Sequence, residues 1–217
     1  MKMILLSLCS HGVDVVSKHI AILGEIPRHV WVACSGGSDS MAVLDFVRRS
    51  HHVQVAFFHH GTTTSDQALP IIQAYCDSHG LPLTVGHIQG QKPKDQSAEE
   101  WWRNCRLEFL HALPAEVITA HHLDDCVETY LFNCVHGKSH TIPYRNQNIL
   151  HPFLTTAKSV FTSWCSRKQV PWHEDHTNQD VKYMRNLIRH EIVPQALKVN
   201  PGLRTVVRKI VVDSLSK

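Results

Sequence analysis

Apolar runs alternate along the chain with segments whose apolar residues recur at helical spacing. The apolar runs are short enough for buried strands, and they fall at 30–34, 53–59, 81–88 and 117–120. The segments with helical spacing follow them, at 40–49, 66–79, 98–111 and 123–135. Because strands that alternate with helices build parallel βαβ units, the pattern predicts a Rossmann-like α/β fold, with helices on both faces of a parallel sheet.

Beyond Gly137 the alternation is less regular. A final strand is predicted at 149–153, a helix at 155–169, and a helical segment at 181–199 that Pro194 interrupts. A last helix with a basic face begins near Pro201. We therefore expect a main domain over residues 1–175 and a short helical C-terminal extension over residues 176–217.

The composition narrows the class of protein. With 217 residues, 43% of them hydrophobic and 19% charged, the chain fits an ordinary globular protein. None of its apolar runs approaches the roughly 20 residues of a membrane span. The apolar run at 3–9 is interpreted as a first helix or strand rather than a signal peptide. We expect a cytoplasmic protein with no membrane partner.

Cysteine usage and net charge limit the chemistry further. The seven cysteines are an odd number and form no C-x-x-C pair, which argues against a disulfide framework, a zinc ribbon and an iron–sulfur site. Reduced, mostly buried thiols are expected instead. The net charge of +3 permits a nucleic-acid partner without requiring one.

One loop joins the first predicted strand to the first helix, and it consists of Ser35, Gly36, Gly37, Ser38, Asp39 and Ser40. Backbone N–H groups and the positive end of the helix dipole converge there, and the glycines leave that place uncovered. The serine hydroxyls add donors, so a phosphate chain is the expected ligand. Asp39 then suits a Mg²⁺ ion held between the carboxylate and the phosphates. The alternative is an ordinary Gly-Ser turn in which Asp39 caps the helix.

A second polar cluster, at 119–129, follows the fourth strand and should lie at the same edge of the sheet. His122, Asp125 and Glu128 recur at helical spacing, and two acids occupy the first helical turn. Acidic residues beside a phosphate site predict metal binding or proton transfer. The alternative is that the acids only begin a helix and that His121 packs in the core.

Arginines recur on two other predicted helices. Arg103 and Arg106 share one face of the third helix, and Arg185 and Arg189 lie four residues apart near the C-terminus. Arginine forms bidentate contacts with phosphate, so both pairs are candidates for an anion site. Solvated surface arginines and a plain amphipathic helix are the alternatives.

Together these segments resemble one known family in their order and spacing. S-G-G-S-D-S is the signature of the N-type ATP pyrophosphatases. The remaining segments look like one branch of that superfamily, the tRNA(Ile)-lysidine synthetases. They are F-H-H-G, R-x-x-R, A-H-H-L-D-D-x-x-E-T, L-H-P-F-L, W-H-E-D-x-T-N and R-N-x-I-R-H-x-I-V-P. The resemblance covers residues 30–201 and is far more specific than any single motif.

The resemblance implies an adenine nucleotide α-hydrolase-like fold and an ATP-pyrophosphatase catalytic domain over residues 1–175. It implies ATP and Mg²⁺ as cofactors, and free L-lysine and the wobble cytidine of an isoleucine tRNA as substrates. In such an enzyme, ATP adenylates the C2 oxygen of the cytosine, and the lysine ε-amine then displaces AMP to give lysidine. The implied activity is that of an ATP-dependent ligase that releases AMP and pyrophosphate.

Roles within the family carry over to the matching residues. The loop 35–40, together with His60 and Arg106, is implied to bind ATP, and Asp39 and Asp125 are implied to hold Mg²⁺. The implied catalytic residues are Asp39, Arg106, His122, Asp125, Arg185 and Arg189. The arginines would stabilise charge at the α-phosphate, whereas His122 and Asp125 would flank the metal or position the base and the lysine amine.

Two features depart from the family pattern. Members usually carry further C-terminal domains that bind tRNA, and this sequence stops soon after Pro201, so we expect a shortened form with only the catalytic domain. The family's glycine-rich loop is also reduced, to residues 135–140. Contacts to tRNA would then come from a homodimer, from a partner protein, or from basic surface residues such as Lys198, Arg204, Arg208 and Lys209.

Two other functions remain open. One is another adenylating enzyme of the superfamily, such as a tRNA thiolase or an amidotransferase-type synthetase, although thiolases generally carry cysteine pairs and this sequence has none. The other is a catalytically reduced protein that binds nucleotide or tRNA without turnover.

Overall fold

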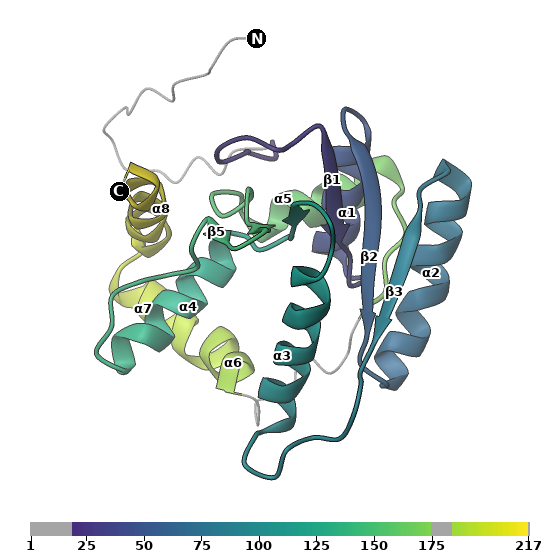
Figure 1. The fold of residues 1–217 in the computed structure, drawn as a ribbon. Coiled ribbons are helices and arrows are strands. Elements are labelled where there is room, and N and C mark those ends of the chain that lie inside the picture. The colour runs from purple at the N-terminus through teal and green to yellow at the C-terminus, as the bar shows by residue number, and fades with distance from the viewer. Residues whose placement is uncertain (1–18, 175–183, 217) are drawn as a thin grey trace.

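A six-stranded sheet organises the part of the chain that the computed structural model describes, residues 19–174 and 184–216 (Figure 1). Its strands are β1 (His29–Ala33), β2 (His52–His59), β3 (Leu83–His87), β4 (Val117–Ile118), β5 (Arg145–Asn146) and β6 (Ile149–Leu150). They are ordered β3-β2-β1-β4-β6-β5, and neighbours are parallel except β5 and β6. The predicted α/β fold is confirmed.

Helices connect the strands and continue beyond the sheet. They are α1 (Ser38–Arg48), α2 (Thr63–His79), α3 (Ala98–His111), α4 (Leu123–Val135), α5 (Lys158–Lys168), α6 (Met184–Leu187), α7 (Val193–Val199) and α8 (Leu203–Asp213). A π-helical turn, Ile188–Ile192, joins α6 to α7, and a 3-10 turn, Ser214–Ser216, follows α8. The helices α3 and α4 have the predicted bounds, because their capping residues and apolar spacing lie within the segments themselves.

Side chains that alternate along β1 divide the core between the two faces of the sheet. Val30 and Val32 pack with α1, α2 and α5, whereas Trp31 packs with Leu110 of α3 on the other face. Figure 1 shows α3 in front of the sheet and α1 behind it. Because both faces are covered, the strands are continuous apolar runs instead of alternating polar and apolar residues.

A separate apolar cluster lies where α4 packs against α8. Leu123 and Cys126 of α4 are buried together with Val207 and Val211 of α8. The C-terminal helices therefore hold α4, the helix that begins at the second polar cluster. The division of the chain at residues 175 and 176 stays a prediction.

Two local features differ from the sequence prediction. The segment at 181–199 is predicted to break at Pro194, but its described part stays helical, with the π-helical turn just before the proline. Pro194 has no N–H for the carbonyl of His190, and the N–H of Val193 donates to Ile188, five residues back. The last parallel strand ends at Leu150 rather than at residue 153, and it pairs with the short β5 through a turn at Gln147, which has φ of +52°.

Some sequence predictions fall outside the described ranges: the first helix or strand at 3–9, and the part of W-H-E-D-x-T-N beyond residue 174. Within the described ranges, no helix has the length and apolar character needed to cross a membrane. The six cysteines of the same ranges are all free thiols, and four of them are buried.

Candidate active site

Two polar loops meet at the carboxyl edge of the sheet, between β1 and β4. These strands are parallel neighbours, although the chain leaves β1 toward β2 and returns to β4 on the other side. Such a switch in strand order opens a crevice at the carboxyl ends of the strands, where α/β proteins bind ligands. His122 Nε2, after β4, lies 3.4 Å from Asp39 Oδ2, after β1. The prediction that both clusters share one edge is therefore confirmed.

Gly36 and Gly37 leave the loop after β1 open to close approach. Gly36 has φ of +85°, a conformation that side chains rarely adopt, and an added Cβ would lie 2.9 Å from the Cβ of Ala68. Gly37 is the N-cap of α1, and no side chain caps the first amides of this helix. These amides and the positive end of the helix dipole are therefore available to an anion.

The serines of the loop have different surroundings. Ser40 is buried, and its hydroxyl donates to the carbonyl of Gly37 at 3.0 Å and accepts from the N–H of Ser35 at 3.1 Å. Its one hydrogen is thus used within the loop, which stabilises the bend. Ser38 is half-buried and better placed to donate to a phosphate, whereas Ser35 is exposed but its hydroxyl lies 3.2 Å from Ser40 Oγ and must turn away from it to do so.

Asp39 has a carboxylate oxygen that suits a metal ion. Its Oδ1 is buried and has no hydrogen-bond partner among the described residues. Such an oxygen is unfavourable unless a ligand satisfies it. Mg²⁺ takes one or two carboxylates together with phosphate oxygens and water, rather than a cage of protein ligands. In residues 19–174 and 184–216, no group of three or more His, Cys, Asp or Glu is arranged to hold a metal, which leaves Asp39 as a single anchoring carboxylate.

His122 and Asp125 cap the start of α4 reciprocally. The backbone N–H of Asp125 donates to His122 Nδ1 at 3.2 Å, and the N–H of His122 donates to Asp125 Oδ2 at 3.0 Å. The neutral ring therefore carries its hydrogen on Nε2, which faces Asp39. Burial lowers the pKa of His122, but the charges of Asp125 and Asp39 outweigh burial and raise this pKa above its usual value.

The two C-terminal arginines pair with carboxylates of α4. Arg185 donates to Asp125 Oδ1 at 2.7 Å and to Glu128 Oε2 at 3.3 Å. Arg189 donates to both oxygens of Glu128, at 2.6 Å and 3.0 Å. In this arrangement both guanidinium groups neutralise acids, so their contact with the α-phosphate stays a prediction.

Asp125 differs from Asp39 as a candidate metal ligand. One of its oxygens accepts from the N–H of His122 and the other from Arg185. Burial opposes ionisation, but His122 and Arg185 lower the pKa of Asp125 to about 2, so it is a carboxylate at neutral pH. Its charge is already compensated, and Asp39 is the better candidate of the two.

Arg106 gives the site a positively charged side, and His60 lies close enough to be affected by its charge. Burial lowers the pKa of Arg106 to about 10, and the nearby charges of Arg103 and Arg185 act in the same direction. Within the described part of the chain, no carboxylate pairs with Arg106. Burial and the charge of Arg106 also lower the pKa of His60 to about 4, so its ring is neutral at pH 7. A half-buried cation without a counter-ion favours an anionic ligand.

Two acids have roles that the sequence did not indicate. Glu128 is buried and binds both arginines, and its helical spacing from Asp125 and its place in the D-D-x-x-E-T segment marked it without indicating this pairing. Asp124 accepts from Arg204 of α8 and from the N–H of Lys158, each at 3.0 Å. Arg204 lies 80 residues from Asp124, so no local pattern links them. This arginine, predicted to be tRNA-binding surface, is engaged within the chain.

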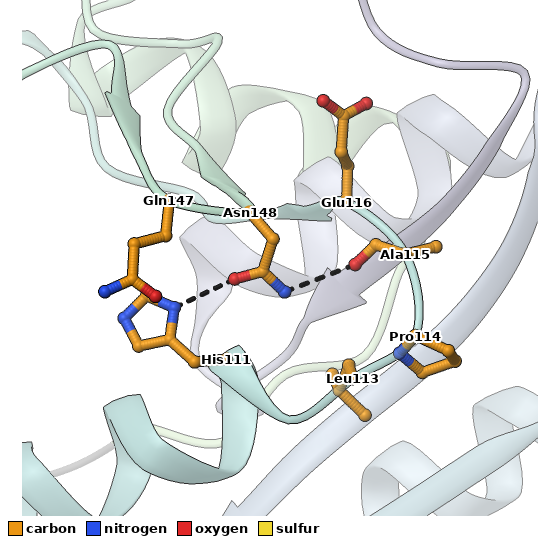
Figure 2. Close-up of a pocket in the computed structure, with 7 residues that line it drawn as sticks. All are labelled: His111, Leu113, Pro114, Ala115, Glu116, Gln147 and Asn148. Atoms are coloured by element: carbon orange, nitrogen blue, oxygen red, sulfur yellow. Dashed lines mark hydrogen bonds between the residues drawn. The ribbon is translucent and has the colours of Figure 1, made fainter.

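A pocket of about 300 Å³ lies away from this site, next to the segments that lead into β4 and β6 (Figure 2). Its polar groups satisfy one another. Asn148 Oδ1 lies 2.8 Å from His111 Nδ1, and Asn148 Nδ2 donates to the carbonyls of Leu110 and Ala115 at 3.0 Å and 3.3 Å. We interpret this pocket as a structural contact between the end of α3 and the sheet. The last carbonyl groups of a helix lack partners within the helix, and Asn148 donates to one of them, that of Leu110.

Comparisons with known proteins agree with the motifs. A tRNA(Ile)-lysidine synthase from Exiguobacterium sibiricum is 31% identical in an alignment of 186 residues that covers 79% of this chain and 44% of the relative. One from Francisella philomiragia is 28% identical in an alignment of 203 residues that covers 86% of this chain and 50% of the relative. The chain thus spans about half the length of the curated relatives it matches.

Two further comparisons concern the domain itself. An NH3-dependent NAD synthetase from Campylobacter jejuni aligns over 85% of this chain and 83% of its own, with a TM-score of 0.48 and 14% identity. The PP-loop domain family matches residues 14–196, which include both polar loops and the paired arginines. The resemblance to tRNA(Ile)-lysidine synthetases is thereby confirmed, and the chain belongs to the PP-loop domain family.

Proposed function

We propose that the chain uses ATP and free L-lysine to convert the wobble cytidine of an isoleucine tRNA to lysidine. The cytosine C2 oxygen attacks the α-phosphorus of ATP, the bond between the α and β phosphates breaks, and pyrophosphate leaves. The lysine ε-amine then attacks C2, and AMP leaves with the C2 oxygen. The similarity to relatives named tRNA(Ile)-lysidine synthases supports this choice of substrates.

The contact of 3.4 Å between His122 Nε2 and Asp39 Oδ2 carries the proposal. It joins a loop suited to phosphate with an acidic helix start at one switch point of the sheet. An adenylating enzyme needs this juxtaposition, because phosphates and the accepting substrate must meet within a few ångströms. A simple nucleotide-binding turn would need only the first of the two loops.

The open amides of α1 and the hydroxyls of Ser35 and Ser38 would bind the ATP phosphates. Mg²⁺ would be held by Asp39, whose Oδ1 has no partner among the described residues, and when bound it would neutralise charge on the phosphates. Arg106 would stabilise the charge that develops at the α-phosphate, because it is a half-buried cation without a carboxylate partner in the described residues.

Asp125 would position the lysine amine by its charge. A carboxylate whose pKa is about 2 attracts an ammonium group but takes up protons poorly at pH 7. The amine would share Asp125 with Arg185, which already donates to Oδ1. His122 would keep Asp125 in place through the reciprocal cap at the start of α4.

Pyrophosphate release tests the proposal when ATP, tRNA and lysine are omitted in turn. We expect release to require tRNA, and mass analysis of the tRNA nucleosides to detect lysidine only when lysine is present. Release that is indifferent to tRNA and lysine would refute the proposal. Binding of ATP and tRNA without any release would indicate the catalytically reduced alternative.

The pKa values of the buried thiols argue against a thiolase-like reaction. Burial raises the pKa of Cys34 to about 11, and that of Cys76, Cys126 and Cys165 to about 12. Thiols with such pKa values are poor nucleophiles at neutral pH. A sulfur-containing nucleoside in place of lysidine in the same mass analysis would favour the thiolase instead.

A further inference from the structure

We propose that Trp102 and His60 form a nucleobase site beside the phosphate loop, in which the base stacks on Trp102 and its edge meets His60. The choice of ligand rests on the proposed function, because ATP and tRNA both bring a nucleobase to this edge of the sheet. The site would deepen that function by fixing where one of the two bases lies.

An aromatic series leads from the core of the sheet to Trp102. Phe58 of β2 lies 5.6 Å from Phe109 of α3 and 5.0 Å from His60, measured between ring centroids. The rings of His60 and Trp102 are 6.0 Å apart. Phe58 is buried and holds the series in place, whereas Trp102 is only half-buried and keeps ring surface for a ligand. A flat ring that stacks on Trp102 would continue the series outward.

His60 supplies an unsatisfied polar atom at this place. Its Nδ1 is buried and has no hydrogen-bond partner among the described residues. The ring is neutral at pH 7, because burial and the charge of Arg106 lower its pKa to about 4. A buried ring nitrogen without a partner is unfavourable, and the edge of a nucleobase carries donors and acceptors that would satisfy it.

The arginines near Trp102 favour an anionic ligand over a cationic one. Arg106 lies four residues after Trp102, so both side chains project from one face of α3. Arg103 and Arg185 are close enough to Arg106 to affect its pKa. Like charges repel the ammonium group of lysine, whereas a neutral base attached to phosphate fits both the aromatic ring and the arginines.

The position of His60 agrees with such a ligand. β2 is the parallel neighbour of β1, and His60 follows the last residue of β2. It therefore lies at the same carboxyl edge as the loop 35–40, one strand away. A nucleotide bound with its phosphates at the loop, or a base delivered to the α-phosphate, would reach this edge.

Equilibrium binding to the full chain tests the site with three probes: ATP, inorganic tripolyphosphate and an anticodon stem-loop RNA that contains the wobble cytidine. We expect Trp102→Ala to weaken one of the two base-containing probes roughly 5- to 150-fold, the range of one lost stacking contact. Tripolyphosphate, which has no base, should bind as before. Weaker ATP binding would assign the adenine to Trp102, and weaker RNA binding with unchanged ATP binding would assign the tRNA base.

Two variants control the experiment. Trp102→Phe keeps an aromatic ring and should recover most of the affinity, and Trp101→Ala removes the neighbouring, equally half-buried tryptophan of α3. The inference is overturned if ATP and RNA bind Trp102→Ala as tightly as they bind Trp101→Ala, or if tripolyphosphate binding falls equally. Thermal unfolding shows whether each variant folds. If Trp102→Ala does not fold, the inference is tested by comparing the ligand binding of Trp102→Phe with that of the wild type. Failure of the proposed function is a separate result, the absence of pyrophosphate release by the wild type.

Discussion

The bidentate pair between Arg189 and Glu128 offers a quantitative test of how the C-terminal helices hold the site. Glu128 has only 6% of its side chain exposed and Arg189 has 24%, so little water screens the two charges. Removing one partner of a buried pair typically costs about 3–5 kcal/mol, because the other charge is left without compensation. We expect Arg189→Ala to lower the free energy of unfolding by about 3 kcal/mol, the lower end of that range, because Arg185 Nε remains 3.3 Å from Glu128 Oε2.

Urea and thermal unfolding measure this effect. For a domain of this size, about 3 kcal/mol corresponds to a fall of roughly 6–12 °C in Tm. Arg145→Ala is the matched control, because Arg145 pairs with Glu116 on the surface and 51% of its side chain is exposed. A surface pair contributes at most about 1 kcal/mol. The same unfolding experiments should therefore hardly distinguish Arg145→Ala from the wild type.

A double variant separates the ion pair from simple packing. Replacing both partners, Arg189→Met with Glu128→Leu, removes the uncompensated charge, so the double variant should be more stable than Arg189→Ala by about 1–2 kcal/mol. The reasoning is refuted if Arg189→Ala costs less than about 0.5 kcal/mol. It is also refuted if the double variant is the least stable of the set.

Three further predictions concern the site and its pH dependence. Asp39→Ala should abolish pyrophosphate release while the protein still folds, because Asp39 Oδ1 has no partner in the described residues and Oδ2 only faces His122 Nε2 at 3.4 Å; retained release would mean that another group holds Mg²⁺. Gly36→Ala should lower the free energy of unfolding by about 1–3 kcal/mol and weaken ATP binding, since φ is +85° and the added Cβ meets Ala68; an unchanged urea midpoint would contradict this. Burial lowers the pKa of His121 to about 3, so only the unfolded chain takes up its proton between about pH 6.5 and pH 3. The free energy of unfolding should therefore fall as the pH decreases through that window, and His121→Asn should reduce the slope measured by urea unfolding at several pH values.

Much of the fold was predictable because its signals are local. The apolar runs of the strands and the helical spacing of α3 and α4 lie within segments of fewer than 20 residues. The sequence Ser97-Ala98-Glu99-Glu100 predicts a capping box at the start of α3, and Ser97 Oγ does accept from the N–H of Glu100, although no return bond from the Glu100 side chain is found among the described residues. The cap of α4 escaped prediction, because a histidine rather than a serine or aspartate accepts the helix amide.

The site itself was predictable only in part. The glycine loop and the acidic helix start follow directly from residue types, since a positive φ needs glycine and a helix start favours acids. The ion pairs of Arg185 and Arg189 could not be predicted from the sequence, because their partners lie 57 to 61 residues earlier in the chain. From the sequence they were candidates for a phosphate contact, and in the fold they are bound to Asp125 and Glu128.

The sequence alone therefore determined the strand and helix order, the anion-binding loop and the acids that face it, because each depends on residues within one or two helical turns. Only the tertiary structure decided which of the charged groups are neutralised by a partner within the protein and which can still attract a ligand. Packing of the C-terminal helices on α4 compensates Asp125 and Glu128, and it leaves Arg106 without a carboxylate in the described residues. Burial removes the solvent that would otherwise screen these charges, so their effect depends on neighbours that only the fold supplies.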